Sequence, residues 1–259
     1  MAEDERYRIQ VLSRAFSVLD AFDEDRPHMR LDELHRRTAI PKPTLLRIVR
    51  TLELERFLVR DDGRYTLGAR ILTLAHNYLG KTSLPRLAEP HFRRLARTHG
   101  LSISLAVLDE IEVVYLAVEN PKLELGLQGD LGKRHPAHAT AVGKVLLAAL
   151  DRATLRHRLD GLTLTSLTPN THTDLAALLG ELDLVRRQGH AVDDEERGIG
   201  IRCVAVPIRD AGGSVMAAMS CAGPTPRCPP ESVPRLVAAL GEVADEISAQ
   251  IGFRTVPLP

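Results

Sequence analysis

The stretch Ile40-Pro-Lys-Pro-Thr-Leu-Leu-Arg-Ile-Val-Arg-Thr-Leu52 decides how the first part of the chain folds. Four of its apolar side chains recur at spacings of three and four residues: Leu45, Ile48, Val49 and Leu52. This spacing predicts a helix with one buried face. Thr44, Arg47 and Thr51 fall on a different face, and residues 34–52 contain five lysines or arginines and no acidic residue. A helix that buries one side and presents threonine and arginine on the other is typical of a helix that enters a DNA groove.

The segments around this helix predict a winged helix-turn-helix. Residues 31–38 form a short amphipathic helix, and Ala39 and Ile40 form the turn that follows it. Downstream, two β-prone runs, 57–60 and 64–67, flank a turn that contains glycine, which is the signature of a β-hairpin. Arg60 and Arg64 on this hairpin, the wing, are placed to reach the phosphate backbone.

A further helix is expected ahead of this motif, over residues 9–22, and the polar segment 23–29 is expected to be a loop. The buried stripe of the first helix is expected to consist of Leu12, Ala15, Phe16, Leu19 and Phe22.

Composition limits the classes of protein to which the chain can belong. Its 259 residues suit two domains, and 44% hydrophobic with 26% charged residues is ordinary for a globular protein. The formal net charge is zero, so DNA binding must come from a local basic patch. Three cysteines without metal-type spacing predict reduced thiols and no disulfides. An acidic start and the lack of a long apolar run predict a cytoplasmic protein without a membrane segment.

The second part of the chain predicts an α+β domain. A helix over 69–79 is followed by a break at residues 80–85, which we take as the domain boundary. Beyond it the pattern indicates an antiparallel sheet with helices packed on it. The expected helices are 84–98, 138–150, 175–188 and 231–251; the expected strands are 102–108, 111–118, 190–193, 201–208 and 215–222, and residues 129–136 are expected to be a loop.

Four stretches of the chain resemble the isocitrate-lyase-regulator (IclR) family of bacterial transcription factors. They are the recognition-helix block from Ile40 to Arg47, the wing exit Asp62-Gly-Arg-Tyr-Thr-Leu-Gly68, the block His135-Pro-Ala-His-Ala-Thr-Ala-Val-Gly-Lys144, and Asp193-Asp-Glu-Glu196 with Gly200-Ile-Arg-Cys-Val-Ala-Val-Pro-Ile-Arg-Asp210. The resemblance implies a winged helix-turn-helix domain (1–68), a linker and dimerisation helix (69–82), a GAF-like effector-binding domain (83–253) and a tail (254–259). It also implies a homodimer or homotetramer on a pseudo-palindromic operator of double-stranded DNA, with a small organic acid or aromatic metabolite as effector.

The resemblance also assigns site residues. Thr44 and Arg47 match DNA-contacting positions, and the basic residues Lys42, Arg50 and Arg64 are added to them from the charge pattern. The implied effector pocket consists of the backbone amides of two residues and three side chains, namely Ala141, Val142, Asp193, Cys203 and Ser220.

Three further expectations concern this pocket, two from physical chemistry and one from the resemblance. The first turn of the helix over 138–150 offers unpaired amides to a carboxylate, and the small residues Ala139, Ala141 and Gly143 would let a ligand approach. Asp193 would have to accept a bond from a ligand hydroxyl, orient a donor or be protonated. Ala222 replaces a second pocket serine of some relatives, which favours an effector with an apolar body over a small 2-oxo acid.

Two other departures from the family pattern concern the DNA-binding part. Pro43 stands where a serine is usual, which removes a hydroxyl that could hold a phosphate, and Ala39 replaces the usual turn glycine.

Three other classes of function also fit parts of the sequence. A cysteine-dependent enzyme would use Cys203 with a histidine and Asp193, but the sequence has no nucleophile elbow, so no catalytic residue is expected. A zinc-dependent sensor would use Cys221, Cys228 and a histidine, whose spacing fits no standard zinc site, so no metal or other cofactor is expected. A protein-interaction module without DNA binding is the third alternative.

Overall fold

The computed structural model of the chain describes residues 7–23, 25–81, 84–121 and 131–253; the expected tail at 254–259 lies outside them. Residues Met1–Lys81 and Thr82–Pro259 form two separate units. Each unit has its own hydrophobic core. The two units are therefore described one after the other.

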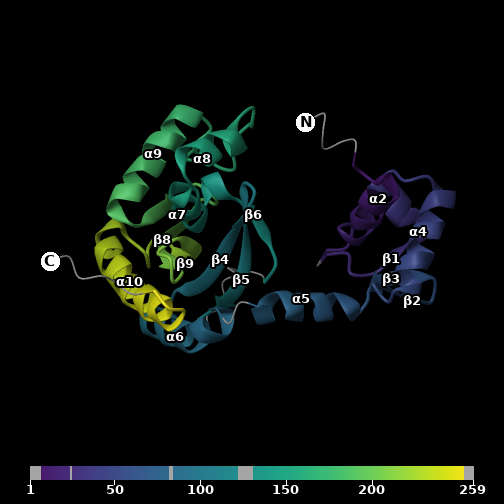
Figure 1. The fold of residues 1–259 in the computed structure, drawn as a ribbon, viewed down its shortest axis with the longest axis horizontal. Coiled ribbons are helices and arrows are strands. Elements are labelled where there is room, and N and C mark those ends of the chain that lie inside the picture. The colour runs from purple at the N-terminus through teal and green to yellow at the C-terminus, as the bar shows by residue number, and fades with distance from the viewer. Residues whose placement is uncertain (1–6, 24, 82–83, 122–130, 254–259) are drawn as a thin grey trace. The chain divides into compact units, whose positions relative to one another are not determined.

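The first unit is a winged helix-turn-helix (Figure 1). Its three-stranded antiparallel sheet has the order β1-β3-β2. Its elements are α2 (Gln10–Leu19), β1 (Met29–Arg30), α3 (Leu31–Thr38), α4 (Lys42–Leu54), β2 (Leu58–Asp61), β3 (Arg64–Leu67) and α5 (Arg70–Lys81). The two-residue strand β1 corrects the expectation of a loop up to residue 29, because Met29 pairs with Tyr65 of the wing.

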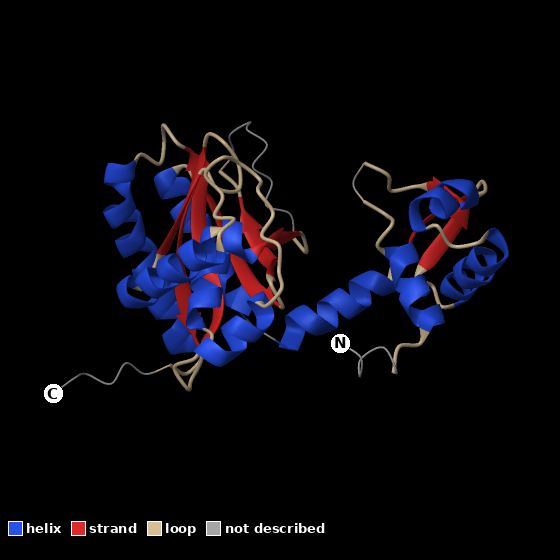
Figure 2. Cartoon of the chain, turned by 90° about the horizontal axis from the view of Figure 1, so that it is seen from above, coloured by secondary structure: helices blue, strands red, loops and turns tan. Residues whose placement is uncertain are grey.

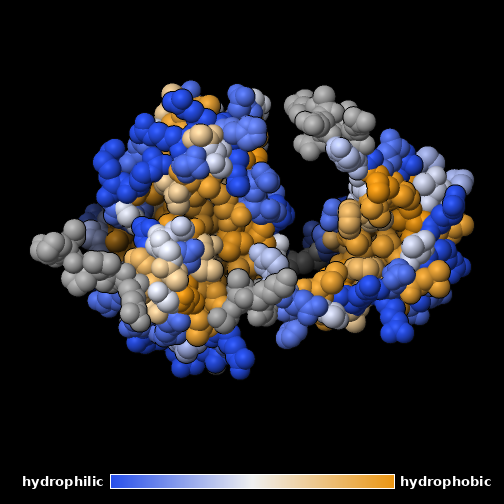
Figure 3. All heavy atoms as spheres, in the orientation of Figure 1, coloured by the Kyte–Doolittle hydropathy of each residue, from blue (hydrophilic) through white to orange (hydrophobic). Residues whose placement is uncertain are grey.

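Helix α4 buries the face that its spacing predicts: Leu45, Ile48, Val49 and Leu52 are in the core. The prediction for α2 was partly wrong. Val18 is fully buried, whereas Leu12 and Phe16 are 50% and 61% exposed. With other apolar residues of this segment they form an apolar patch on the surface of the first unit (Figure 3).

Two turns position the recognition helix and the wing. Ala39 ends α3 in the left-handed conformation, with φ 55° and its amide donating to the His35 carbonyl oxygen at 2.9 Å. At the wing tip, Asp62 and Gly63 both have positive φ, which is the two-residue turn that suits the twist of a hairpin. Arg30 is a poor cap for α3, and the Glu33 carboxylate, which accepts from the Arg30 amide at 2.6 Å, takes part of that role.

The second unit is built on a six-stranded antiparallel sheet of order β6-β5-β4-β9-β8-β7. Its strands are β4 (Ser102–Asp109), β5 (Glu112–Glu119), β6 (Arg134–Pro136), β7 (Ala191–Asp194), β8 (Ile201–Arg209) and β9 (Val215–Pro224). Its helices are α6 (Leu84–His99), η1 (Ala137–Ala139), α7 (Ala141–Ala149), α8 (Arg152–Leu159), α9 (Leu175–Gln188), η2 (Pro230–Ser232) and α10 (Val233–Gln250).

Helices cover both faces of this sheet (Figure 2). Helix α7 packs across the central strands and is covered in turn by α9, while α6 and α10 pack together against other sheet residues. The expected α+β domain with an antiparallel sheet is confirmed.

Two local expectations in this unit were wrong, and one helix was not predicted. Residues 134–136 are strand β6, because they pair with β5. The helix expected from residue 138 begins at Ala141, after the 3-10 turn η1, with Thr140 as its N-cap. Helix α8, which the Asp151 carboxylate caps through the Ala153 and Thr154 amides, was missed.

Candidate functional site

The exposed side of α4 carries four of the five predicted DNA-binding residues. Lys42 forms an ion pair with Asp32 at 2.8 Å, and Arg50 forms one with Glu53 at 3.0 Å. Within the described part of the chain, the exposed Arg47 has no ion-pair partner. Its guanidinium can therefore bind another molecule without first leaving an acidic partner. Thr44 is half-buried, one turn ahead of Arg47.

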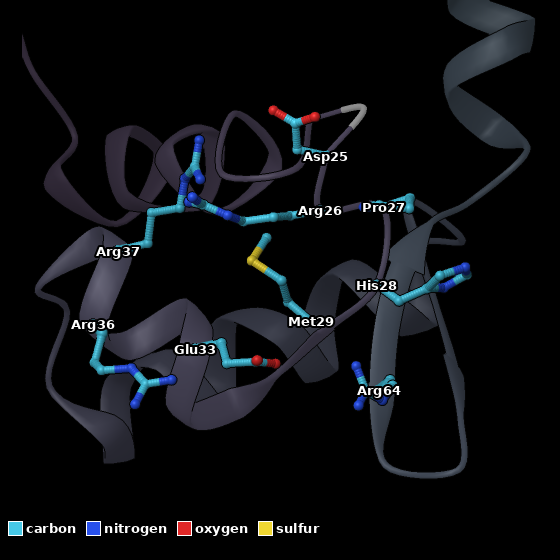
Figure 4. A pocket seen from close by; sticks show the side chains of 9 residues that line it. All are labelled: Asp25, Arg26, Pro27, His28, Met29, Glu33, Arg36, Arg37 and Arg64. Atoms are coloured by element: carbon cyan, nitrogen blue, oxygen red, sulfur yellow. The ribbon is translucent and has the colours of Figure 1, made fainter.

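Basic residues also surround a surface hollow beside the wing (Figure 4). Arg36 on α3 and Arg64 on β3 both line it. Across residues 7–23 and 25–81 neither of these two arginines has an ion-pair partner, whereas Arg37 is bound to Asp23 at 2.5 Å. On α3 and β3, the guanidinium groups that line the hollow without an acidic partner are therefore those of Arg36 and Arg64.

A cavity of about 210 Å³ lies in the second unit, on the side of the sheet where α7 begins. Its floor follows the register of the sheet, because Ser102, Ala222, Cys203 and Asp193 are successive partners across β4, β9, β8 and β7. Side chains two residues apart on a strand point to the same face. The paired residues Ser104 and Ser220 accordingly form a second row of the same floor.

The walls of this cavity come from four other elements. Tyr115 and Val118 on β5 and Thr140 at the start of α7 line it. His135 on β6 lines it too, as do Arg197 and Gly198 in the segment between β7 and β8, and Ile201 lines it at the start of β8. The cavity thus combines hydroxyl groups, one carboxylate and one guanidinium with apolar side chains.

Asp193 is 3% exposed and accepts hydrogen bonds from the amides of Glu196 at 2.8 Å and Arg197 at 3.2 Å. Burial raises the pKa of this carboxyl to about 6, against the lowering effect of the two amides. The nearby Glu196 carboxylate adds to the increase and Lys144 opposes it. Asp193 can therefore be either charged or protonated in the cavity at a mildly acidic pH.

The hydroxyls of Ser104 and Ser220 lie 2.8 Å apart and are hydrogen-bonded to each other. Burial raises the pKa of the neighbouring Cys203 thiol to about 12, so that group stays a neutral thiol at physiological pH. A neutral thiol is a poor nucleophile.

The structure places the expected effector residues Asp193, Cys203 and Ser220 around one cavity, and Ala141 and Val142 are not among the residues that line it. The Thr140 hydroxyl accepts from the Gly143 amide at 3.1 Å and so uses one of the free amides of α7. Gly143 serves packing rather than ligand access, since a Cβ there would lie 2.2 Å from the Ala137 carbonyl oxygen.

A buried ionic cluster lies beside the cavity. Lys144 is fully buried, and its ammonium nitrogen lies 2.5 Å from both Glu181 and Glu196 and 2.6 Å from the Val192 carbonyl oxygen. His172, Glu181 and Glu196 form the one metal-type group found in the described ranges, with ligand atoms within 4.8 Å of one another. The Lys144 ammonium balances the charge of one of these two carboxylates, and the Nε2 atom of His172 lies 2.6 Å from the Glu181 carboxylate.

The sequence did not indicate the roles of Arg197, Thr140, Ser104 and Tyr115 in the cavity. Only strand register and tertiary packing bring them together. Of the two histidines in the 135–144 block, His135 lines the cavity, whereas His138 is buried with its Nε2 atom 3.1 Å from the Thr165 carbonyl oxygen.

Comparison with known proteins identifies the family. The IclR helix-turn-helix domain matches residues 11–62, and the bacterial transcriptional regulator IclR C-terminal domain matches residues 76–249. The chain belongs to the IclR family. It is a DNA-binding transcriptional regulator with a winged helix-turn-helix and an effector domain, as the sequence predicted.

The sequence similarity of this IclR protein to its relatives covers nearly the whole chain. It is 35% identical to the HTH-type transcriptional regulator KdgR of Escherichia coli, over 94% of this chain and 93% of KdgR. It is 33% identical to the p-hydroxybenzoate hydroxylase transcriptional activator of Acinetobacter baylyi, over 91% of this chain and 89% of that protein. The crystal structure of an IclR homologue from Microbacterium hydrocarbonoxydans complexed with 4-hydroxybenzoate matches with a TM-score of 0.82 and 30% identity, over 93% and 99% of the two chains.

In the described residues of this IclR protein, the helices are too short or too polar to cross a membrane.

Proposed function

We propose that α4 enters the major groove of an operator and that Arg47 contacts a base there. The observation that carries this proposal is the free guanidinium of Arg47 on the exposed side of a helix whose opposite side is fixed in the core. Lys42, Thr44, Arg50 and Arg64 would contact phosphates and set the orientation. Lys42 and Arg50 would first exchange an exposed acidic partner, which costs little because exposed ion pairs contribute only about 0–1 kcal/mol.

As a member of this family, the protein would act as a homodimer or homotetramer on a pseudo-palindromic operator near genes of a catabolic pathway. Two α4 helices related by a two-fold axis read two half-sites separated by one or more helical turns. A protein with this function works where the DNA is, and we place it in the bacterial cytoplasm for that reason.

We further propose that the cavity beside α7 binds the effector, a small organic acid with an apolar body. Its volume of about 210 Å³ equals that of roughly seven water molecules, which suits a compact monocyclic or short-chain ligand. Tyr115, Val118, Ile201 and Ala222 provide apolar contacts, while Asp193, Cys203 and Ser220 provide polar ones. The complex of the Microbacterium homologue with 4-hydroxybenzoate supports an aromatic acid as the first compound to test.

Selection of duplex DNA from a random library by the full-length protein tests the DNA-binding proposal. We expect an enriched inverted repeat that the protein binds with strong salt dependence. Enrichment of no sequence, or binding that survives loss of all α4 cations, would favour the interaction-module alternative. Adding 4-hydroxybenzoate to the selected complex tests the effector proposal, which predicts a change in operator affinity.

A further inference from the structure

The two edge strands of the effector-domain sheet are joined across the cavity by one side chain. Strands β6 and β7 lie at opposite ends of the strand order. Arg197 follows β7 closely, and its guanidinium donates a hydrogen bond to the Nε2 atom of His135 on β6, at 2.7 Å. Both residues line the cavity, and Arg197 is exposed, so this contact lies at the mouth.

The protonation state of His135 explains how the basic side chains of His135 and Arg197 can lie 2.7 Å apart. Burial, then Arg197 and Lys133, lower the pKa of His135 to about 4. The imidazole is therefore neutral at physiological pH and can accept a hydrogen bond through Nε2. Its ring also lies edge-on to Tyr115, with 5.7 Å between ring centres, which restricts its orientation.

The remaining charges leave the Arg197 guanidinium without a counter-ion. Among the residues placed by the structure, Arg197 has no ion-pair partner. Asp193 is the one acidic residue among those that line the cavity, and the amides of Glu196 and Arg197 already bind its carboxylate. Arginine retains hydrogen-bond donors after one bond to His135, because its guanidinium carries five N–H groups.

We infer that Arg197, oriented by His135, recognises the acidic group of the effector at the cavity mouth and selects anionic over neutral ligands. This inference rests on the proposed effector function of the cavity and adds a specificity-determining residue to it. The carboxylate binds the free N–H groups of Arg197, and the apolar body of the ligand lies against Tyr115, Val118 and Ile201. Polar groups at the other end of the ligand meet the Ser104–Ser220 pair.

The test is calorimetric titration of the full-length protein with 4-hydroxybenzoate and with 4-hydroxybenzamide, which has nearly the same shape but no charge. We expect the wild type to bind the acid about tenfold or more tightly than the amide, because a hydrogen bond to a charged group contributes more to binding than a hydrogen bond to a neutral group. Arg197→Met should bring this ratio close to one through weaker binding of the acid, and Arg197→Lys should restore part of it.

Arg134→Met is the matched control. It removes a positive charge next to His135, but Arg134 is bound to Asp109 and Glu112 and does not line the cavity. We expect it to keep the acid-to-amide ratio of the wild type. His135→Gln, which keeps an acceptor, should reduce the ratio less than His135→Ala if His135 positions Arg197.

An unchanged ratio in Arg197→Met, or no preference for the acid in the wild type, would overturn the inference. Binding of neither compound would overturn it too, because it commits the cavity to small acids of this size. Failure of the proposed function has a different result. In that case no selected DNA would be bound, or the acid would bind and be discriminated without changing operator affinity.

Discussion

The ammonium nitrogen of Lys144 lies 2.5 Å from a carboxylate oxygen of Glu196, and both side chains are buried. This ion pair connects α7 to the segment between β7 and β8, in which Arg197 is the next residue after Glu196. The same ammonium holds Glu181 on α9. The pair thus attaches the backbone segment that contains Arg197 to helix α7, which begins at the cavity.

Lys144→Met is expected to lower the free energy of unfolding by about 3–5 kcal/mol, because it leaves the buried Glu196 carboxylate without its counter-charge. Urea denaturation of the full-length protein measures this change. Arg152→Met is the control, since Arg152 is largely exposed and lies 3.6 Å from Asp183. That variant should stay within about 0.5 kcal/mol of the wild type. Equal effects of the two substitutions would show that burial does not strengthen the Lys144 contacts.

Local sequence signals predicted the elements that depend on local physics. Helix α3 and helix α9 have the expected bounds, because their periodic apolar residues and the turns at Ala39 and Gly189 are visible in the sequence. Strand β6 could not be predicted, since three residues form a strand only when β5 is beside them. In α2, periodicity selected Leu12 and Phe16, but packing buried Val18.

The residues of the candidate sites likewise divide into those that a sequence signal indicated and those that only the folded structure brings together. The charge pattern and apolar spacing of α4 indicated Arg47, and the family resemblance indicated Asp193, Cys203 and Ser220. Nothing in the sequence indicated Arg197, because its role depends on a hydrogen bond to His135, which is 62 residues away.

Asp193 should make stability depend on pH between about 4 and 6. Its pKa in the folded protein, about 6, lies above the ordinary value of 3.8, so the folded state holds the proton more tightly. The stabilising contribution is therefore complete below about pH 4 and is lost as pH rises through 6, a change of about 3 kcal/mol. Urea unfolding from pH 4 to pH 8 should show that Asp193→Asn gains stability relative to the wild type as pH rises.

Asp245→Asn, on the exposed side of α10, is the control for this pH series. Its stability difference from the wild type should stay constant from pH 4 to pH 8. A constant difference for Asp193→Asn as well would contradict a raised pKa at Asp193.

Arg47→Ala should weaken binding to the selected operator by about 1–3 kcal/mol and relax the preference for one base pair in each half-site. Lys42→Ala should instead weaken binding to all sequences alike and reduce the salt slope by about one unit. Fluorescence anisotropy at several salt concentrations, with the operator and single-base variants, separates the two patterns. Equal loss on all sequences for Arg47→Ala would assign that residue to phosphate contact.

Ala39→Gly should stabilise the first unit. The residue has φ 55°, and the left-handed conformation costs an alanine about 1–2 kcal/mol that glycine avoids. Glycine loses part of this gain through its larger entropy in the unfolded chain, so we expect a net increase of about 0.5–1 kcal/mol. Thermal unfolding measures it, with Ala15→Gly inside α2 as the comparison, where a loss of about 1 kcal/mol is expected. No gain at residue 39 would mean that the turn relaxes without strain.

Gly143→Ala and Gly180→Ala should have opposite effects, although both residues lie inside helices. Alanine is the better helix former by about 1 kcal/mol, and at Gly180 in α9 a Cβ would meet no atom within 4 Å, so that variant should be more stable. At Gly143 a Cβ would lie 2.2 Å from the Ala137 carbonyl oxygen and 2.4 Å from the Ala137 Cα atom. Backbone must therefore move, and we expect a loss of about 1–3 kcal/mol in urea denaturation. Because Gly143 also donates to the Thr140 hydroxyl at the cavity wall, the same substitution should weaken 4-hydroxybenzoate binding, whereas Gly180→Ala should not.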